Sequence, residues 1–288
     1  MPIHSFVERS LINFDAQLHM MNFFLNKVIV VTGGSDGIGK ALVELLLSQG
    51  AQVITCGRNA EKFSSLLQQF PSAPLLVETA DVSKEDDCRQ LVAAAVERFG
   101  KIDVLINNAG ISMRAEFAET GMGTLRKVME INFWGAVYMT KYALPYLQKS
   151  KGTITGISSI AGYRGLPGRS GYSASKFALQ GWMESLRTEL LHTGIHVMWV
   201  CPGFTASSIR QYALNAGAAP QGETPLDEAS LMSSATCAAH ILKAIEERRR
   251  TLVLTFTGKR TVWLNKLFPS LADRLVHKFF YKNGILVK

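Results

Sequence analysis

The sequence predicts an α/β protein built on a doubly wound parallel sheet of about seven strands, with helices on both faces. Two observations support this prediction. From Lys27 to Thr255, short runs rich in β-branched residues alternate with longer segments of helical spacing, which is typical of successive strand and helix pairs. The first strand candidate is followed directly by a glycine-rich turn and then by a helical run. Sheets of this class commonly begin in that way.

Each strand candidate is a short apolar run bounded by turn residues. These candidates are residues 27–32, 52–56, 75–80, 104–107, 153–158, 196–201 and 251–255. The helix candidates carry apolar residues at intervals of three and four. They are residues 38–48, 60–70, 84–99, 122–148, 172–192 and 236–249. A seven-stranded sheet covered on both faces follows from this alternation.

Composition places the chain among folded globular proteins, because 47% of its 288 residues are hydrophobic and 19% are charged. The net charge of +8 favours an anionic partner such as a phosphorylated cofactor, nucleic acid or an acidic membrane surface. Nucleic-acid binding is not expected, since the basic run at 248–250 is short. The four cysteines form no CxxC pair and are expected to be free thiols in a reducing compartment. The histidines lack HxxxH or HExxH spacing, so no metal site is predicted.

We expect one catalytic domain at 25–256 and two extensions, because no linker or repeat divides that body. In the extension at 1–24, apolar residues recur at helical spacing. This helix could pack on the body or a partner, contact a membrane, or arise from an upstream start codon, since Met20 and Met21 precede the first strand. No signal peptide or membrane-spanning run is found in the sequence, so we expect a cytoplasmic protein that is either free or peripheral on a membrane.

A glycine turn follows the first strand and reads Thr32-Gly33-Gly34-Ser35-Asp36-Gly37-Ile38-Gly39. A strand, a glycine turn and a helix in this order are the context that a dinucleotide-binding fingerprint requires. Gly33 permits the tight turn, Gly37 lets the backbone approach a pyrophosphate, and Gly39 allows close packing of helix on strand. The helix N-terminus then faces the phosphates. An ordinary flexible turn is the alternative.

With this turn, the sequence resembles the short-chain dehydrogenase/reductase family, in the branch whose turn is TGxxxGIG. Three further motifs carry the resemblance: Asn107-Asn108-Ala109-Gly110, Tyr172-Ser173-Ala174-Ser175-Lys176 and Pro202-Gly203. The resemblance covers about residues 27–255. It implies a Rossmann-type sheet of strand order 3-2-1-4-5-6-7, a nicotinamide cofactor, a small-molecule carbonyl or alcohol substrate, and a homo-oligomer.

The end of the second strand bears on the choice between NAD and NADP. NAD enzymes need an acid there for the ribose hydroxyls, whereas a 2′-phosphate needs a cation. Gly57 stands where the family's NAD-users carry the acid, and Arg58 follows where its NADP-users carry an arginine. We therefore expect NADP(H) rather than NAD(H). Asp36 departs from this pattern, because many NADP-users have a basic residue in that part of the turn.

The resemblance implies a set of cofactor-binding residues along the carboxyl ends of the strands. Asp81 should accept a hydrogen bond from the adenine amino group beside Val82; the alternative role of Asp81, a cap of the helix expected at 84–99, is compatible with this contact. The full set is Gly33, Ser35, Asp36, Gly37, Ile38, Gly39, Arg58, Asn59, Asp81, Val82, Asn108, Ala109, Gly110, Tyr172, Lys176, Pro202, Gly203 and Ser207.

Tyr172 and Lys176 are one helical turn apart, so their side chains leave the same helix face. A fixed ammonium near a phenol favours the phenolate and so tunes the tyrosine toward proton transfer. By resemblance, Lys176 also holds the nicotinamide ribose, and Ser159 donates to the substrate oxygen. Ser158 is the competing candidate for that role. Asn132 matches the family asparagine that anchors a water leading from the lysine to solvent.

The stretch at about 204–235 is long and weakly periodic, and by resemblance it is a substrate lid. In the extension at 257–288, Ser270 can cap a helix whose apolar face includes Leu271 and Phe279, and Gly284 can end it. Basic and aromatic residues precede this helix, which suits a membrane interface. A packed or dimer-forming helix is the alternative.

These features predict an NADP(H)-dependent oxidoreductase that acts on a carbonyl or alcohol carbon, with Tyr172 as general acid or base. Contact with a membrane would make a lipophilic substrate natural, such as a sterol, a sphingoid or a long-chain acyl compound. A 3-oxoacyl-carrier-protein reductase is the alternative enzyme. A non-catalytic NADP(H) sensor or scaffold is the alternative of another class.

Overall fold

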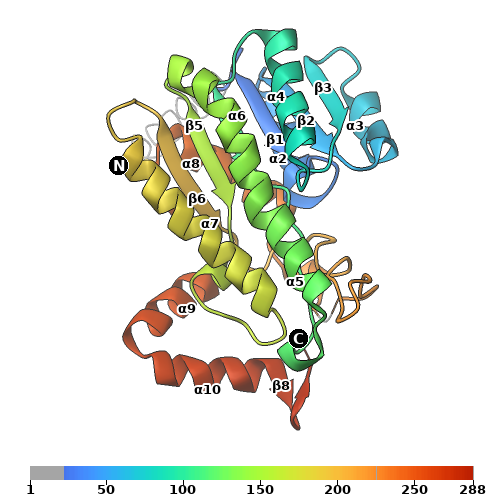
Figure 1. The fold of residues 1–288 in the computed structure, drawn as a ribbon, viewed down its shortest axis with the longest axis vertical. Coiled ribbons are helices and arrows are strands. Elements are labelled where there is room, and N and C mark those ends of the chain that lie inside the picture. The colour runs from blue at the N-terminus through green and yellow to red at the C-terminus, as the bar shows by residue number, and fades with distance from the viewer. Residues whose placement is uncertain (1–22, 225, 288) are drawn as a thin grey trace, which may run out of the picture.

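The computed structural model describes residues 23–224 and 226–287. Its centre is a parallel sheet of seven strands in the order β3-β2-β1-β4-β5-β6-β7 (Figure 1), which confirms the predicted fold class and strand order. The strands are β1 (Val28–Thr32), β2 (Gln52–Gly57), β3 (Leu75–Thr79), β4 (Val104–Asn107), β5 (Thr153–Ile157), β6 (His196–Cys201) and β7 (Thr251–Val253). Strand β1 pairs with both β2 and β4, so the direction of winding reverses at this point of the sheet.

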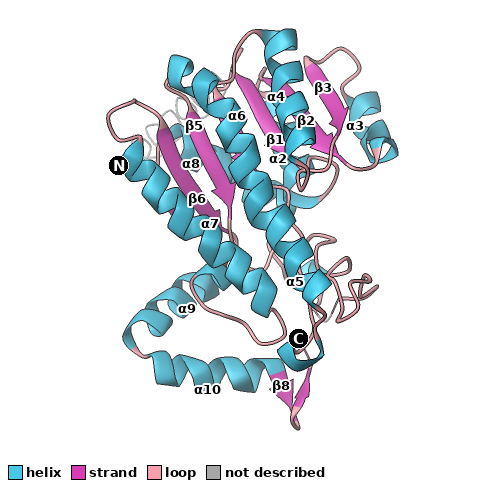
Figure 2. Cartoon of the chain, in the orientation of Figure 1, coloured by secondary structure: helices cyan, strands magenta, loops and turns pink. Residues whose placement is uncertain are grey.

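Helices cover both faces of the sheet (Figure 2). One face packs against α4 (Glu85–Phe99), α6 (Gly135–Ser150) and α7 (Ser170–Glu189) through one buried apolar cluster. The other packs against α2 (Gly37–Ser48), η1 (Ala60–Phe63), α3 (Ser64–Gln69) and α8 (Ser234–Glu246) through a second cluster. The central strands β1, β4 and β5 are buried along their whole length, as expected for a parallel sheet between helix layers.

The single helix predicted for 122–148 is interrupted in its middle. The structure has α5 (Met122–Met129), a π-helical segment η3 (Glu130–Trp134) and then α6. Asn132 lies in the π-helical segment, where one extra residue per turn widens the helix. Its side chain holds the backbone of Ile111 by donating to the carbonyl and accepting from the amide. This long-range pairing cannot be recognised from helical periodicity.

The C-terminal part of the chain differs from the prediction. It forms α9 (Phe256–Leu267) and α10 (Pro269–Phe280), followed by a hairpin of β8 (Tyr281–Lys282) and β9 (Ile285–Leu286). The prediction that Ser270 caps the helix is wrong, because α10 already begins at Pro269, a residue suited to the first helical position. Gly284 does not end the helix either. It lies in the hairpin turn with φ of 77°, a conformation that favours glycine.

Figure 1 shows that α9 and α10 project from one end of the body; we call residues 256–287 the C-terminal arm. Most of the N-terminal extension predicted at 1–24 lies outside the described residues. Phe24 is described, and it is fully buried in the cluster that contains α2. The folded body therefore includes this last residue of the predicted extension. Within the described part of the chain, no helix combines the length and hydrophobicity needed to span a bilayer.

Candidate active site

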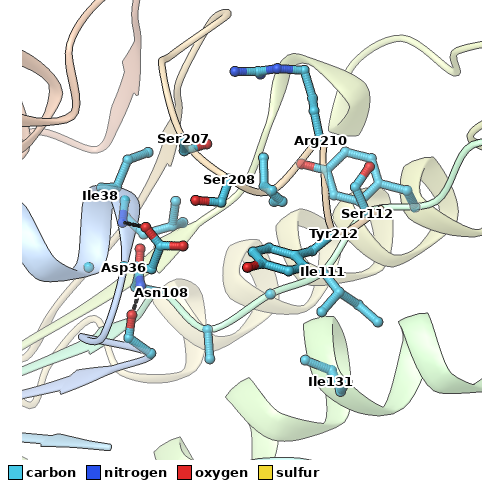
Figure 3. A pocket seen from close by; sticks show the side chains of 18 of the residues that line it. Asp36, Ile38, Asn108, Ile111, Ser112, Ile131, Ser207, Ser208, Arg210 and Tyr212 are labelled. Atoms are coloured by element: carbon cyan, nitrogen blue, oxygen red, sulfur yellow. Dashed lines mark hydrogen bonds between the residues drawn. The ribbon is translucent and has the colours of Figure 1, made fainter. Parts of the chain in front are cut away.

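A cavity of about 610 Å³ lies at the carboxyl ends of the strands, beside the ends of the neighbouring strands β1 and β4. Ligands of doubly wound sheets bind at this reversal point, and this volume is typical of small-molecule sites. Figure 3 shows Asp36 and Asn108 at one end of the cavity and Ser112 and Arg210 at the other. The segment predicted as a lid spans the cavity, with Ser207 and Ser208 at the end of the glycine turn and Arg210 at the other end.

The glycine turn is fixed by contacts that exclude side chains. Gly33 has φ of 70°, which favours glycine. A Cβ on Gly39 would stand 2.1 Å from the carbonyl oxygen of Gly33 and 2.4 Å from Nδ2 of Asn108. Asn108 donates from Nδ2 to the carbonyl of Thr32 at 2.8 Å, so the end of β4 is joined to the turn. The start of α2 is thereby held against the floor of the cavity.

Two cations line the cavity beyond β2. Arg58 is exposed there, and Lys62 lies over the ring of Tyr212 from the lid, with Nζ 4.9 Å from the ring centroid. Asn59 caps η1 by accepting from the amide of Glu61. Asp36 accepts from the amide of Gly37 at 2.7 Å, so this carboxylate caps α2. The sequence analysis missed Lys62, although its place four residues after Arg58 in a basic chain is a usable signal.

Ser35, Ile38, Asp81, Val82, Ala109 and Gly110 also line the cavity. The side chain of Asp81 accepts from the amide and hydroxyl of Ser83, and α4 begins later, at Glu85 after an N-cap at Lys84. The alternative role of Asp81 as the cap of this helix is therefore wrong. Val82 is buried and lies against Gly135, because a Cβ on Gly135 would stand 2.9 Å from the side chain of Val82.

Ser159, Tyr172 and Lys176 meet at the middle of the cavity. The amine of Lys176 donates to the carbonyl of Ile157 at 2.8 Å and lies 5.7 Å from the ring centroid of Tyr172. Burial raises the pKa of Tyr172, while a hydrogen bond with Ser159 opposes that rise. Burial also lowers the pKa of Lys176 to about 8. Desolvation thus outweighs the effect of neighbouring charges on both groups.

The two candidate serines face different partners. Ser159 bonds to Tyr172 and accepts from the amide of Ala161. Ser158 is buried and accepts from the side chain of Gln180 at 2.8 Å. Only the hydroxyl of Ser159 is therefore paired with the tyrosine.

Asn132 is buried behind this group. Its Nδ2 donates to the carbonyl of Ile111 and to the hydroxyl of Ser175, and its Oδ1 accepts from the amide of Ile111. Because its amide group is used in this way, Asn132 fixes the chain that follows β4 against the helix that carries Tyr172.

The segment predicted as a lid lies across the cavity. Pro202, Gly203 and Ser207 line it, and the Cβ of Ser207 would be 3.1 Å from a Cβ on Gly37. Arg210 holds the segment together through two hydrogen bonds to the carboxylate of Glu228. The C-terminal arm reaches the same rim, since Phe204 stacks on Phe279 with ring centroids 6.3 Å apart.

Arg169 is a second residue that the sequence analysis missed. It lines the cavity and stands one helical turn before Tyr172, a spacing that places both residues near one another. The four cysteines are buried and unpaired. Among the described residues, no group of three or more His, Cys, Asp or Glu side chains is arranged to hold a metal ion.

Comparisons with known proteins agree with this geometry. A family model described as short chain dehydrogenase matches residues 27–216. The chain is 33% identical over 263 residues to dehydrogenase/reductase SDR family member 7B of Mus musculus, covering 88% of this chain and 81% of that protein.

Two further proteins extend the comparison. The chain is 35% identical over 260 residues to 11-beta-hydroxysteroid dehydrogenase A of Arachis hypogaea, covering 86% of this chain and 73% of that protein. A crystal structure of a short-chain dehydrogenase from Streptomyces avermitilis superposes with a TM-score of 0.76 at 28% identity, covering 89% of this chain and 99% of that one.

Proposed function

The chain belongs to the short-chain dehydrogenase/reductase family of oxidoreductases, and from this premise we propose that it is an NADP(H)-dependent enzyme acting on a carbonyl or alcohol carbon. The observation that carries the proposal is the meeting of Ser159, Tyr172 and Lys176 in one cavity with the glycine turn. A proton-transfer group is thereby set beside a site suited to a dinucleotide. The cavity, the lid and the body at 25–256 form one catalytic domain in this proposal.

The residues present fit a nicotinamide dinucleotide. Gly37, Ile38 and Gly39 at the start of α2 line the cavity, and a helix N-terminus at this place suits a pyrophosphate. Asp81 keeps carboxylate acceptor capacity for an adenine amino group after bonding to Ser83. A bound nicotinamide cofactor would supply or accept the hydride. Lys176 lines the same cavity beside Tyr172, and in this proposal it holds the nicotinamide ribose.

Tyr172 acts as the general acid or base in this proposal. In the direction of reduction, its hydroxyl donates a proton to the substrate oxygen as the carbonyl carbon gains the hydride. Ser159 stabilises the charge that develops on the same oxygen. Lys176 returns a proton toward Tyr172, which its pKa of about 8 permits near neutral pH. In the direction of oxidation the same groups act in reverse, so the reaction balances one hydride against one proton.

The preference for NADP(H) rests on charge at the end of β2. Arg58 and Lys62 both line the cavity where a 2′-phosphate would lie, and Gly57 leaves no acid for the ribose hydroxyls. Asp36 is occupied in capping α2 through the amide of Gly37. Two cations against one carboxylate favour the phosphorylated cofactor.

A lipophilic substrate is supported by the C-terminal arm. Its large apolar side chains are exposed, among them Trp263 (58%), Phe268 (51%) and Leu271 (48%). Lys259, Lys266 and Arg274 lie on the same two helices, a mixture of aromatic and basic residues that suits an anionic membrane surface. Of the apolar stripe predicted on α10, Leu271, Leu275 and Phe279 are exposed, whereas Phe280 is buried. The relative from Arachis hypogaea is named for a hydroxysteroid activity, which agrees with a lipophilic ketone or alcohol.

A screen of ketones and alcohols with NADPH or NADP⁺ tests the proposed function by following nicotinamide absorbance. Steroid, sphingoid and long-chain acyl ketones form the panel, and each is run with and without small unilamellar vesicles containing phosphatidylserine. We expect turnover of at least one lipophilic ketone, with NADPH used in preference to NADH. No turnover of any compound with either cofactor, while NADPH still binds, would favour a sensor instead.

A further inference from the structure

Arg169 occupies an unusual position for a charged side chain. It stands at the N-cap position of α7, three residues before Tyr172, and its guanidinium lines the cavity. One terminal nitrogen, Nη1, donates to the hydroxyl of Ser112 at 3.2 Å. The buried Nε has no hydrogen-bond partner among the described residues. A full positive charge is therefore supported here by one neutral hydroxyl, although burying a charge costs much free energy unless an anion pairs with it.

Arg210 and Arg114 each lie near a carboxylate, although a buried Nη1 of Arg114 also lacks a hydrogen-bond partner among the described residues. Arg210 makes a two-pronged contact with the carboxylate of Glu228. Arg114 lies 3.7 Å from Glu223. Burial lowers the pKa of Arg169 most, Tyr172 opposes this shift, and repulsion by Arg210 and Arg114 adds to it. Both carboxylates are turned to their own arginines, so neither is bonded to the guanidinium of Arg169.

We propose that Arg169 is a specificity-determining residue that binds an oxyanion group of the substrate, a carboxylate or a phosphoryl group, beside the carbonyl that is reduced at Tyr172. The inference rests on the proposed function and names its substrate class more closely. A planar guanidinium with free donors is the protein group best matched to such oxyanions. Ser112, itself buried, accepts a hydrogen bond from the guanidinium, and Figure 3 shows Ser112 beside Arg210 at one end of the cavity.

The geometry limits where the oxyanion can lie. Arg169 and Tyr172 line the same cavity, and each influences the pKa of the other through its charge. A substrate whose carbonyl oxygen meets Tyr172 can therefore present to Arg169 an anionic group that lies close to the reacting carbonyl. The remainder of the substrate extends toward the rim formed by Phe204 and the C-terminal arm, where an apolar chain is accommodated.

Two matched pairs of ketones test the proposal and separate the two oxyanions. The first is 3-oxo-octanoate and its methyl ester, and the second is 2-oxoheptylphosphonate and its dimethyl ester. The ratio of kcat/KM for the anion over its ester is measured with NADPH for wild type, Arg169→Met, Arg169→Lys and Arg114→Met. Arg114 is the matched control, because it contributes the same charge nearby but does not line the cavity.

We expect wild type to prefer the anion of at least one pair, and Arg169→Met to lower that ratio by about 10- to 100-fold, as the loss of a charge-assisted hydrogen bond implies. Arg169→Lys keeps the charge and should retain part of the preference, whereas Arg114→Met should change the ratio by less than about threefold, as expected for an indirect charge. An unchanged ratio in Arg169→Met, or an equal change in Arg114→Met, would overturn the proposal.

Calorimetric binding separates this proposal from the proposed reaction. Each anion is titrated into protein saturated with NADP⁺, so that no reduction takes place. Weaker anion binding to Arg169→Met than to wild type supports the oxyanion site even if none of the four ketones is turned over. The absence of turnover would then count against the proposed oxidoreductase activity alone. Equal anion binding by both proteins would overturn the oxyanion site while leaving the reductase proposal standing. Unchanged NADP⁺ affinity and melting temperature show that Arg169→Met is folded.

Discussion

Removing the cation at Arg58 should change the choice of cofactor. Arg58 lines the cavity beyond β2 and is exposed to solvent, so its contact with a 2′-phosphate is partly screened. A charge-assisted hydrogen bond is worth about 1.5 to 3 kcal/mol, and partial exposure favours the lower end of that range. We therefore expect Arg58→Ala to weaken NADPH binding by about 10-fold. NADH lacks the phosphate and should lose less than about threefold.

Lys62 sets the size of the remaining preference. It is held near the ring of Tyr212 and lines the same part of the cavity. The double variant Arg58→Ala with Lys62→Ala should therefore lose about 100-fold for NADPH if the two contacts are independent.

Both cofactors are titrated by nicotinamide fluorescence. Arg89→Ala is the control, because it removes an exposed arginine of α4 that pairs with Asp86 and is absent from the cavity lining. Equal weakening of NADPH and NADH by Arg58→Ala would refute a phosphate contact. Equal affinity of wild type for the two cofactors would refute the preference itself.

Three further outcomes are expected. Burial raises the pKa of Tyr172 and lowers that of Lys176 to about 8. We therefore expect kcat/KM for alcohol oxidation to rise with pH up to and beyond 8, and kcat/KM for ketone reduction to fall only at alkaline pH. A kcat/KM for oxidation that rises toward acid pH would contradict this. Trp263→Ser with Phe268→Ser should reduce sedimentation with vesicles containing phosphatidylserine by at least about 10-fold, and an unchanged bound fraction would argue against membrane contact by the C-terminal arm. Burial lowers the pKa of His196 from 6.5 to about 4, so its neutral form contributes stability that is present above pH 6.5 and lost as the pH falls toward 4; urea unfolding of wild type and His196→Gln at both pH values should show a smaller loss in the variant.

The body of the fold could be predicted because its central strands are buried along their whole length and its helices are amphipathic. The alternation of strand and helix patterns predicts the doubly wound sheet, and the family resemblance adds the strand order. The π-helical segment at Asn132 could not be predicted, since it depends on a contact with Ile111 from a distant strand end. The end of α10 was predicted wrongly because Gly284 favours a helix end and a hairpin turn equally well.

In the candidate site, too, local sequence patterns could be predicted and contacts that depend on the fold could not. The glycine turn and the tyrosine and lysine pair are local patterns, so the sequence places them correctly on their elements. Lys62 and Arg169 carry no motif, and their place in the cavity follows only from the fold. The pKa of Tyr172 is a further difference. Sequence spacing emphasises the nearby ammonium, whereas burial is the larger influence in the folded protein.

Turnover by Tyr172→Phe is the measurement that tests the central claim most directly. The substitution removes the transferable proton and keeps the ring that packs in the cavity. With a lipophilic ketone identified in the screen and saturating NADPH, kcat should fall by about 100-fold or more, as expected for the loss of general acid catalysis. NADPH affinity, measured on the same samples, should stay within a few-fold of wild type. A variant that keeps more than about a tenth of wild-type kcat would contradict the assignment of Tyr172 as the proton donor.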